Sequence, residues 1–315
     1  MTARPRLVHQ ALVYESADDF AAAATPFLLE GLELGDTLFA TTTAANVDAL
    51  REALGADAGR VELHDTEQWC THPPDRLAAV RRVVDSVPAG RELRALGEPI
   101  WRGSDAVRRE WARYESIINL ALADAPLRFV CLYDGSLPGE IVRHAHCTHP
   151  ELAGHGAAAP SAEFVEPDRY VASLDRAKRP VPDAGVHDVA FDGDPHDFRA
   201  AVAAVARRLG VGSGRIDDVV LAANEIASNA VVHGSPPIGA RAWIDDDEFV
   251  CEISDSGRGL RDPLAGWTIP KRANPGGWGL AVARRLCDAL DIVPRDDGTD
   301  IRLHVSLERV PQPVS

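Results

Sequence analysis

The amino-acid sequence of 315 residues predicts two domains of different fold class, an α/β domain followed by an α+β domain. Three observations support this prediction. Strand and helix patterns alternate over about the first 150 residues. Residues 151–186 then accumulate Ala, Pro and Gly without a sustained period. Beyond them, two helix patterns precede a hairpin, a further helix and a last strand.

In the first half, apolar and β-rich runs predict five strands, at residues 7–14, 36–43, 61–65, 93–98 and 127–134. The segments between them carry helix patterns, which are clearest at residues 18–33, 44–54, 74–87 and 105–123. Strands that alternate with helices through short loops are typical of a parallel sheet covered by helices on both faces.

The second half follows a different order. Pro195 near the start and Gly210 at the stop delimit a helix over residues 194–210. The later patterns predict a helix at 216–233, hairpin strands at 239–244 and 248–254, a helix at 279–290 and a strand at 299–307. We therefore assign one domain to residues 5–152, a linker to 153–184 and a second domain to 185–309.

The composition excludes several classes of protein. The formal net charge is −15, and the arginines are dispersed, so we expect no direct binding to nucleic acid. No apolar run follows the N-terminal arginines and no stretch of eighteen apolar residues occurs, so we expect no membrane span and a cytoplasmic location. The five cysteines are scattered without a C-x-x-C pair, which favours reduced thiols.

The first motif of interest is LAANEIASNAVVHG, in the predicted helix 216–233. Glu225, Asn229 and His233 are spaced four residues apart and therefore lie on one helical face. An Asn oxygen suits Mg²⁺, and a carboxylate one turn earlier could accept a proton from a water or hydroxyl that attacks a γ-phosphate. Taken alone, the spacing also fits an amphipathic helix with a polar edge.

The second motif, residues 255–259 (DSGRG), directly follows the strand pattern FVCEIS. Asp255 could accept a hydrogen bond from an exocyclic amine such as that of adenine, while Gly257 and Gly259 let the backbone approach a base. The alternative is an ordinary Asp-Gly turn.

The third motif, residues 276–280 (GGWGL), opens the helix LAVARRLCDAL. Glycines ahead of a helix present free N–H groups to phosphate oxygens. The segment before this motif has the length and Pro/Gly content of a lid, and its Lys271 and Arg272 are candidate phosphate contacts. A solvated loop is the favoured explanation of those two charges.

Together with Gly298-Thr299 before the last strand, these motifs resemble the Bergerat-type ATPase domain of gyrase, heat-shock chaperones and histidine kinases, and most of all its branch of anti-sigma regulatory serine/threonine kinases. The resemblance covers about residues 185–309 and implies an α/β sandwich of two layers that binds ATP and Mg²⁺. It implies Asn229 as the Mg²⁺ ligand and Glu225 as the general base. For His233 we expect a structural role at the helix end.

The same resemblance assigns the remaining nucleotide contacts to particular residues. It implies that Asp255 binds the adenine amine, with Gly257 and Gly259 in the base pocket and Thr299 on the adenine side. It places Gly277 and Gly279 at the phosphates, and Leu280 of the same motif is counted with the nucleotide-binding residues.

The N-terminal half resembles a different family. The residues that carry the resemblance are HQALVY, FLLEGLELGDTLFATTT, GEPIW at 97–101, Tyr114-Glu115, CLYD at 131–134 and His149-Pro150. They resemble the MEDS sensory domain of methanogen and methylotroph regulators, over about residues 5–152. That family is similar to RecA-like cores, so a RecA-like parallel sheet is expected, degenerate because no G-x-x-x-x-G-K-[ST] occurs.

Four residues near the end of this half, His144, His146, Cys147 and His149, could in principle ligate a metal. Capping of a helix C-terminus is the simpler interpretation of the histidines.

These features predict an ATP-dependent anti-sigma-type serine/threonine kinase gated by a sensor. Its expected partners are a sigma factor or an anti-anti-sigma antagonist protein, and homodimers are common among such relatives. None of the eleven histidines lies in a phosphoacceptor context, which disfavours a histidine autokinase that feeds a response regulator. The alternative from another class is an adaptor that holds ATP and controls its partner by binding alone.

Overall fold

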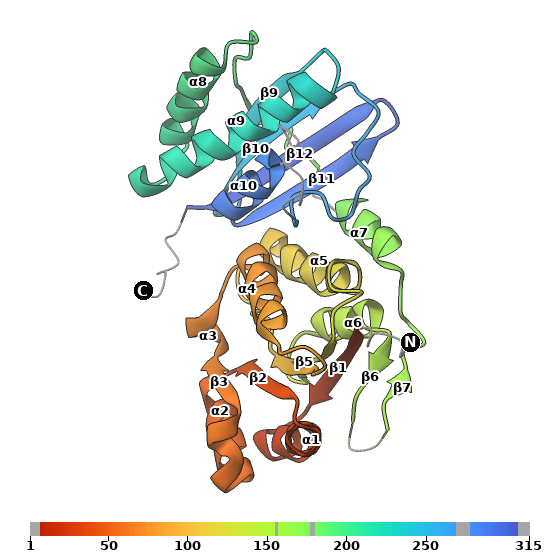
Figure 1. The fold of residues 1–315 in the computed structure, drawn as a ribbon. Helices are drawn as coiled ribbons and strands as arrows, with labels where there is room; N and C mark the ends of the chain where they lie inside the picture. The colour runs from red at the N-terminus through yellow and green to blue at the C-terminus, as the bar shows by residue number, and fades with distance from the viewer. Residues whose placement is uncertain (1–6, 155–156, 177–179, 269–277, 308–315) are drawn as a thin grey trace. The chain divides into compact units, whose positions relative to one another are not determined.

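The computed structural model describes residues 7–154, 157–176, 180–268 and 278–307 (Figure 1). The chain divides into two compact units. One comprises Met1–Arg102 with Trp111–Tyr170, and the other comprises Gly103–Glu110 with Val171–Ser315. The range predicted as a linker contains a short strand, β7 (Ala159–Pro160), and a helix, α7 (Pro167–Arg176).

The first unit is built on a seven-stranded sheet in the order β3-β2-β4-β5-β1-β6-β7. Five of its strands occupy the ranges predicted from apolar runs: β1 (Val8–Tyr14), β2 (Thr37–Thr42), β3 (Glu62–Asp65), β4 (Leu93–Gly97) and β5 (Leu127–Asp134). The two short strands β6 (Glu151–Leu152) and β7 form the other edge.

All pairings among β1 to β6 are parallel, as predicted, and only β7 runs antiparallel to its neighbour. The register of β1 with β5 extends from Val8 opposite Arg128 to Tyr14 opposite Asp134. In a parallel sheet the carboxyl ends of the strands meet at one edge, so the loops after β1, β2 and β4 gather there. The RecA-like relationship stays a prediction.

Four helices begin and end close to the expected positions: α1 (Ala17–Leu34), α2 (Ala44–Leu54), α4 (Pro73–Ser86) and α5 (Asp105–Ala121), the last of which belongs to this unit from Trp111 onward. Helix α1 shows why. The Ser16 side chain accepts a hydrogen bond from the Asp19 amide at its start, and Gly35 ends it in the left-handed region with a φ of 77°. Shorter helices lie at α3 (Thr66–Trp69) and α6 (Gly139–Thr148).

The hydrophobic core of the first unit joins α1 and α2 to the sheet. Phe20 and Leu28 of α1 and Leu50 of α2 are buried together with Leu96 of β4 and Leu132 of β5. Burial of such side chains is worth about 1.5 to 3 kcal/mol each, and it fixes the helices against the strands.

The second unit contains a five-stranded antiparallel sheet in the order β11-β12-β10-β9-β8. Its strands are β8 (His187–Asp188), β9 (Gly239–Asp245), β10 (Glu248–Asp255), β11 (Ala289–Arg295) and β12 (Gly298–Ser306). Its long helices are α8 (Pro195–Arg208) and α9 (Ile216–His233), and a shorter helix is α10 (Gly279–Leu286).

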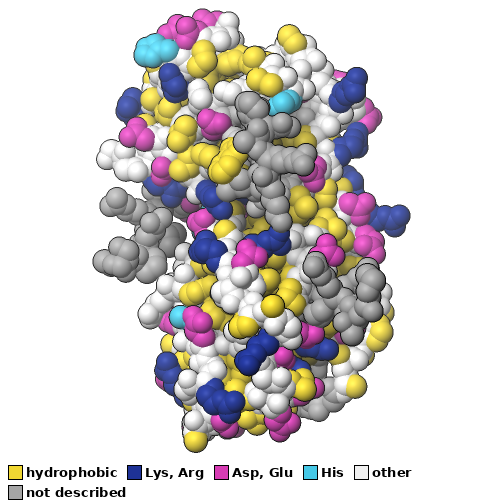
Figure 2. All heavy atoms as spheres, viewed as in Figure 1, with side chains coloured by type: hydrophobic (Ala, Val, Ile, Leu, Met, Phe, Trp, Pro, Cys, Tyr) yellow, Lys and Arg dark blue, Asp and Glu magenta, His cyan; other side chains and the backbone are white. Residues whose placement is uncertain are grey.

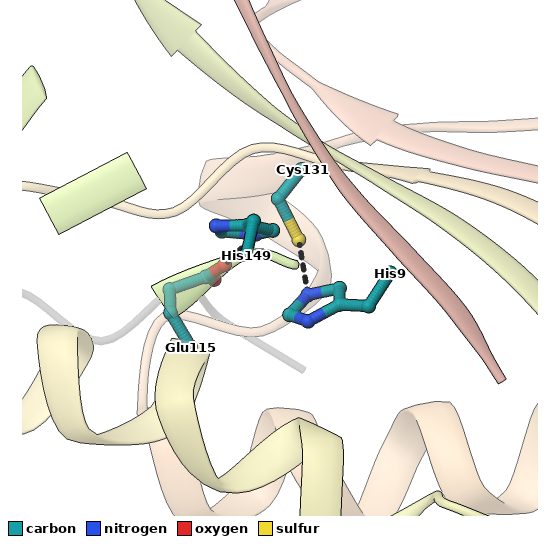
Figure 3. Close-up of side chains that lie close together, drawn as sticks. All are labelled: His9, Glu115, Cys131 and His149. Carbon is teal, nitrogen blue, oxygen red and sulfur yellow. Dashed lines mark hydrogen bonds and ion pairs between the residues drawn. The ribbon is translucent and has the colours of Figure 1, made fainter. Parts of the chain in front are cut away.

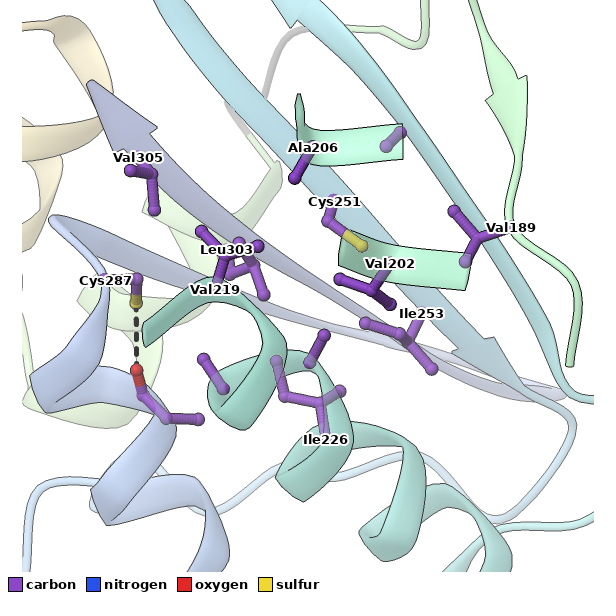
Figure 4. Close-up of a cluster of buried hydrophobic side chains, with 14 of the residues drawn as sticks. Val189, Val202, Ala206, Val219, Ile226, Cys251, Ile253, Cys287, Leu303 and Val305 are labelled. Atoms are coloured by element: carbon purple, nitrogen blue, oxygen red, sulfur yellow. Dashed lines mark hydrogen bonds between the residues drawn. The ribbon is translucent and has the colours of Figure 1, made fainter. Parts of the chain in front are cut away.

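One hydrophobic core holds these helices to the sheet (Figure 4). Val202 of α8 and Val219 and Ile226 of α9 are buried with Cys251 of β10 and Leu303 of β12. All five cysteines of the chain are free thiols, which agrees with the prediction of reduced cysteines.

One element of the second half was predicted wrongly. The pattern of LAVARRLCDAL predicts a helix over residues 279–290, but α10 ends at Leu286, and β11 begins at Ala289. The residues after Leu286 pair with β12 through a complete antiparallel register, from Ala289 opposite His304 to Arg295 opposite Gly298. The alternating apolar residues fit either period, and only the partner strand selects the extended form.

Within the described ranges, no helix combines the length and the apolar character needed to cross a membrane. On the face drawn in Figure 2, Lys and Arg side chains are interspersed with Asp and Glu, and no continuous basic stripe is visible among the described residues.

Candidate functional site

Helix α9 positions the first two candidate residues. Its buried face is formed by side chains such as Val219, Ile226 and Ala230, which pack into the core. Glu225 and Asn229 lie beside that face and are half-buried. Because they are four residues apart, both side chains project from the same side of the helix.

The start of α10 lies against these two side chains. A Cβ atom added at Gly279 would be 2.8 Å from Glu225 Oε2 and 3.0 Å from Asn229 Nδ2. Only glycine leaves both polar groups in place at this distance. The structure therefore brings together residues from two motifs that lie about fifty positions apart in the sequence. They meet at a helix N-terminus, where backbone N–H groups are free to bind anions.

Asn229 has an unusual environment for a buried amide. Its Nδ2 is buried and has no hydrogen-bond partner within the described part of the chain. Buried polar groups are nearly always paired, so an orphaned one indicates a ligand or water contact. The oxygen and nitrogen of an amide are interchangeable by rotation, so Oδ1 can occupy this position and act as a ligand for a cation.

Asp255 ends β10 and lies at the far end of α9. Its Oδ1 accepts a hydrogen bond of 2.7 Å from the Gly257 amide. Gly234, which follows α9, packs directly on it, since an added Cβ would be 2.6 Å from Asp255 Cγ. Gly257 is equally constrained, because its Cβ would lie 2.9 Å from Gly234 Cα. These close approaches explain why both positions are glycine. Among the described residues, the second carboxylate oxygen of Asp255 accepts no hydrogen bond.

Thr299 is brought beside Asp255 by the sheet, where the two residues are paired across β10 and β12. Its Oγ1 accepts a hydrogen bond of 3.1 Å from the Leu260 amide, which fixes the chain just after the D-S-G-R-G motif. Gly259 adopts a φ of 77° in that motif, a conformation that favours glycine.

Arg295 is a neighbour of this site that the sequence did not predict. Its Nη2 donates a hydrogen bond of 2.6 Å to the Asp255 carbonyl oxygen, and Nη1 lies 3.2 Å from Asp300 Oδ1. It belongs to β11, the strand that the pattern did not reveal, so no sequence signal pointed to it.

The remaining residues singled out from the sequence need separate comment. Leu280 is partly buried against the core of the second unit. Gly277, Lys271 and Arg272 lie outside the described residues. His233 is the exposed last residue of α9, and the end of that helix is closed by the Gly234 amide, which donates to the Ala230 carbonyl oxygen at 3.0 Å.

The first unit holds a separate polar cluster at the carboxyl edge of its sheet. Glu98 accepts a hydrogen bond of 2.8 Å from the Tyr14 hydroxyl and another from the Thr42 hydroxyl, and Asn46 donates to Tyr14 at 3.1 Å. Burial and the neighbouring Glu98 carboxylate raise the pKa of Tyr14. The members satisfy one another, so this cluster stabilises the strand ends.

The group His144, His146, Cys147 and His149 does not form one site. His144 Nδ1 contacts the Tyr170 hydroxyl, and the ring stacks on Trp101. His149 instead points into the interior, where its Nδ1 lies 2.9 Å from the Ala145 carbonyl oxygen at the end of α6. His149 therefore caps the C-terminal end of α6, as the capping interpretation predicted.

Comparison with known families identifies both halves. Residues 8–150 match the family model of MEDS, the methanogen/methylotroph, DcmR sensory domain. Residues 194–305 match the family model of the histidine kinase-like ATPase domain. A search of the curated proteins found no match.

Several solved structures are similar to parts of the chain. The RsbU and RsbW domains of Rv1364c from Mycobacterium tuberculosis are 24% identical over 43% of this chain and 35% of that one, with a TM-score of 0.30. The mycobacterial sensor histidine kinase MprB is 21% identical over 38% and 95% of the two chains, with a TM-score of 0.27. The Acinetobacter baumannii histidine kinase AdeS is 12% identical over 45% and 76%, with a TM-score of 0.26. The matched region thus spans about a third of the first of these chains.

Proposed function

Because the chain joins a MEDS sensory domain to a histidine kinase-like ATPase domain, we propose that it is a signalling regulator that binds ATP with Mg²⁺ and phosphorylates a serine or threonine of a partner protein. The observation that carries this proposal is the convergence of Glu225 and Asn229 on Gly279 at the start of α10.

The residues of this site fit a nucleotide and a cation. Asn229 offers a neutral oxygen ligand from an amide whose Nδ2 is buried without a hydrogen-bond partner among the described residues. A Mg²⁺ ion held by Asn229 would supply positive charge beside the phosphate oxygens. The backbone at Gly279 offers N–H donors to the phosphates, and Asp255 accepts from the adenine amine with its free oxygen.

Glu225 gives the site a catalytic base. Its carboxylate lies one helical turn from Asn229, where it can take the proton from a partner's hydroxyl as that oxygen bonds to the γ-phosphorus. The bond to the β-γ bridging oxygen breaks, ADP leaves, and the proton stays on Glu225. A protein that only holds ATP needs Asn229 and Asp255 but no such base.

The partner follows from the resemblance to anti-sigma regulatory kinases. We propose a sigma factor and an anti-anti-sigma antagonist protein as the binding partners, with the antagonist as the phosphoacceptor. The MEDS domain would sense the signal that regulates the kinase activity. A homodimer is the proposed assembly.

The decisive experiment replaces the base alone. Glu225→Gln keeps the size and hydrogen bonding of the side chain but removes its basicity, so ATP affinity should persist while phosphotransfer falls about 10²-fold or more. The measurement is transfer of label from γ-labelled ATP to candidate antagonist proteins, beside ATP binding by calorimetry.

The adaptor alternative predicts a different pattern. An adaptor would transfer no phosphate in either form, and its partner affinity would follow nucleotide occupancy equally in parent and variant. That pattern would overturn the kinase proposal and leave the site as an ATP-dependent switch.

A further inference from the structure

Four side chains from four separate segments meet inside the first unit (Figure 3). They are His9 of β1, Glu115 of α5, Cys131 of β5 and His149 directly after α6. Each is at least 97% buried. Each offers one ligand atom, and these four atoms all lie within 4.8 Å of one another.

The hydrogen bonds around His9 fix its tautomer. Asn119 Nδ2 donates to the carbonyl oxygens of Ser116 and Thr148, so its Oδ1 must be the atom that faces His9. His9 Nδ1 lies 3.0 Å from that oxygen and therefore carries the proton. Its Nε2 is left with a lone pair, 3.3 Å from Cys131 Sγ.

His149 is held in the same way. Its Nδ1 lies 2.9 Å from the Ala145 carbonyl oxygen, which can only accept. The Thr148 hydroxyl donates its proton to the His144 carbonyl oxygen, so toward His149 it too can only accept. Nδ1 therefore carries a proton, and Nε2 of the neutral ring presents a lone pair to the centre of the cluster.

That lone pair faces a carboxylate. His149 Nε2 lies 3.1 Å from Glu115 Oε2, and neither atom makes a hydrogen bond in the ranges that the structure describes. Two buried acceptors that face one another repel, unless a proton or a cation lies between them. Outer hydrogen bonds that orient two histidines by Nδ1 and direct both Nε2 atoms inward are typical of metal ligands.

We propose that His9, Glu115, Cys131 and His149 bind a divalent transition-metal ion of the zinc type. Ligand atoms of a tetrahedral zinc site lie about 3.3 to 3.8 Å apart, for bonds of about 2.0 to 2.3 Å. Two of the pairs already approach this spacing, at 3.3 Å and 3.1 Å.

The chemistry of the ligands selects the class of metal. A thiolate and two imidazoles favour zinc and similar ions, whereas Mg²⁺ and Ca²⁺ prefer oxygen ligands alone. Charge balance agrees. A dication with one thiolate, one carboxylate and two neutral imidazoles has no net charge, which suits a site shielded from water.

Such a site would connect β1, α5, β5 and the segment after α6 of the sensory domain. Four protein ligands complete a tetrahedral sphere, which is the arrangement of structural zinc sites. The proposal concerns the MEDS domain alone and does not depend on the kinase activity.

The test uses the full chain produced in zinc-supplemented and in cobalt-supplemented medium. We expect about one tightly held metal ion per chain by elemental mass spectrometry, and a thiolate-to-cobalt charge-transfer band in the near ultraviolet. In Cys131→Ser the band should vanish and the metal content should fall at least tenfold. Cys147→Ser is the matched control, since Cys147 belongs to the same unit but lies outside the cluster, and it should keep both.

Two results would overturn the proposal. Folded parent protein without bound metal would show that the cluster is a hydrogen-bonded network only, and unchanged metal content and band in Cys131→Ser would place the metal elsewhere. If Cys131→Ser fails to fold, X-ray absorption spectroscopy of the zinc-loaded parent identifies the atoms that ligate the metal. One sulfur with three nitrogen or oxygen ligands supports the site, and a sphere without sulfur excludes it.

Discussion

Gly279 is the residue on which the geometry of the proposed nucleotide site depends most directly. An added Cβ at this position would meet the ends of the Glu225 and Asn229 side chains, and no backbone atom is as close. Because side-chain ends can move, the domain tolerates the change, but the two polar groups do not keep their positions.

We therefore predict that Gly279→Ala weakens ATP–Mg²⁺ binding by roughly tenfold, equivalent to about 1.4 kcal/mol. Stability should be unchanged or slightly higher, since alanine is favoured over glycine in a helix. Calorimetric titration and thermal unfolding measure the two effects. The control is Gly212→Ala, where an added Cβ meets nothing within 4 Å. An unaltered ATP affinity in Gly279→Ala would remove this residue from the site.

Asp255→Asn tests the recognition of the base. The variant keeps an Oδ1 that can accept from the Gly257 amide, so the loop should hold its shape. Its second atom becomes an N–H donor that opposes the adenine amine. We expect ATP affinity to fall about tenfold or more and the preference for ATP over GTP to shrink. Competition binding with both nucleotides measures this, with exposed Asp247→Asn as the control. Equal discrimination in variant and parent would exclude Asp255 from base recognition.

At the scale of elements, β12 carries a charged side chain into the sheet. His304 is buried between its neighbours, with Nε2 3.2 Å from Asp291 Oδ2 of β11 and Nδ1 3.5 Å from Glu248 Oε2 of β10. Burial disfavours the imidazolium, but the hydrogen bonds and charges of Asp291 and Glu248 outweigh it and raise the pKa of His304 to about 9.

This shift predicts a pH dependence of stability. The folded pKa is above the unfolded value of about 6.5, so the stabilisation is complete below pH 6.5 and is lost as the pH rises through 9. Its size is on the order of 3 kcal/mol. The difference in unfolding free energy between parent and His304→Gln, measured by denaturant titration from pH 6 to pH 10, should shrink across this range. A constant difference would show that His304 is not charged in the folded protein.

The border between α10 and β11 shows the limit of local patterns. Residues 279–290 satisfy a helical period, yet the chain leaves the helix at Leu286. The residues of β11 form a full ladder with β12, which the local sequence could not reveal because the partner strand comes later in the chain. The helices with clear caps, such as α1 with Ser16 and Gly35, were placed within a residue or so.

For the whole molecule, we predict a single site that hydrolyses ATP or transfers its γ-phosphoryl group. The MEDS domain lacks the Lys-Ser/Thr pair of a phosphate-binding loop, whereas the ATPase domain carries the complete set of proposed ligands. Asn229→Ala in the full chain should abolish cation-dependent ATP binding and all ATP turnover, with the fold unchanged by circular dichroism. Residual turnover would locate a second centre in the other domain.

The sequence by itself determined the two fold classes, five of the seven strands of the first sheet, and the candidate residues of the proposed nucleotide site. These depend on period, capping and spacing, which are local properties of the chain. It placed Glu225 and Asn229 on one helical face because a helix repeats every 3.6 residues.

Only the tertiary structure decided which distant residues meet. It set Gly279 against Glu225 and Asn229, and Arg295 against Asp255. It also separated His149 from its sequence neighbours and gathered it with His9, Glu115 and Cys131. Such convergence depends on how helices and strands pack around a buried core, and that packing is set by the burial of side chains far apart in the chain, which no local pattern records.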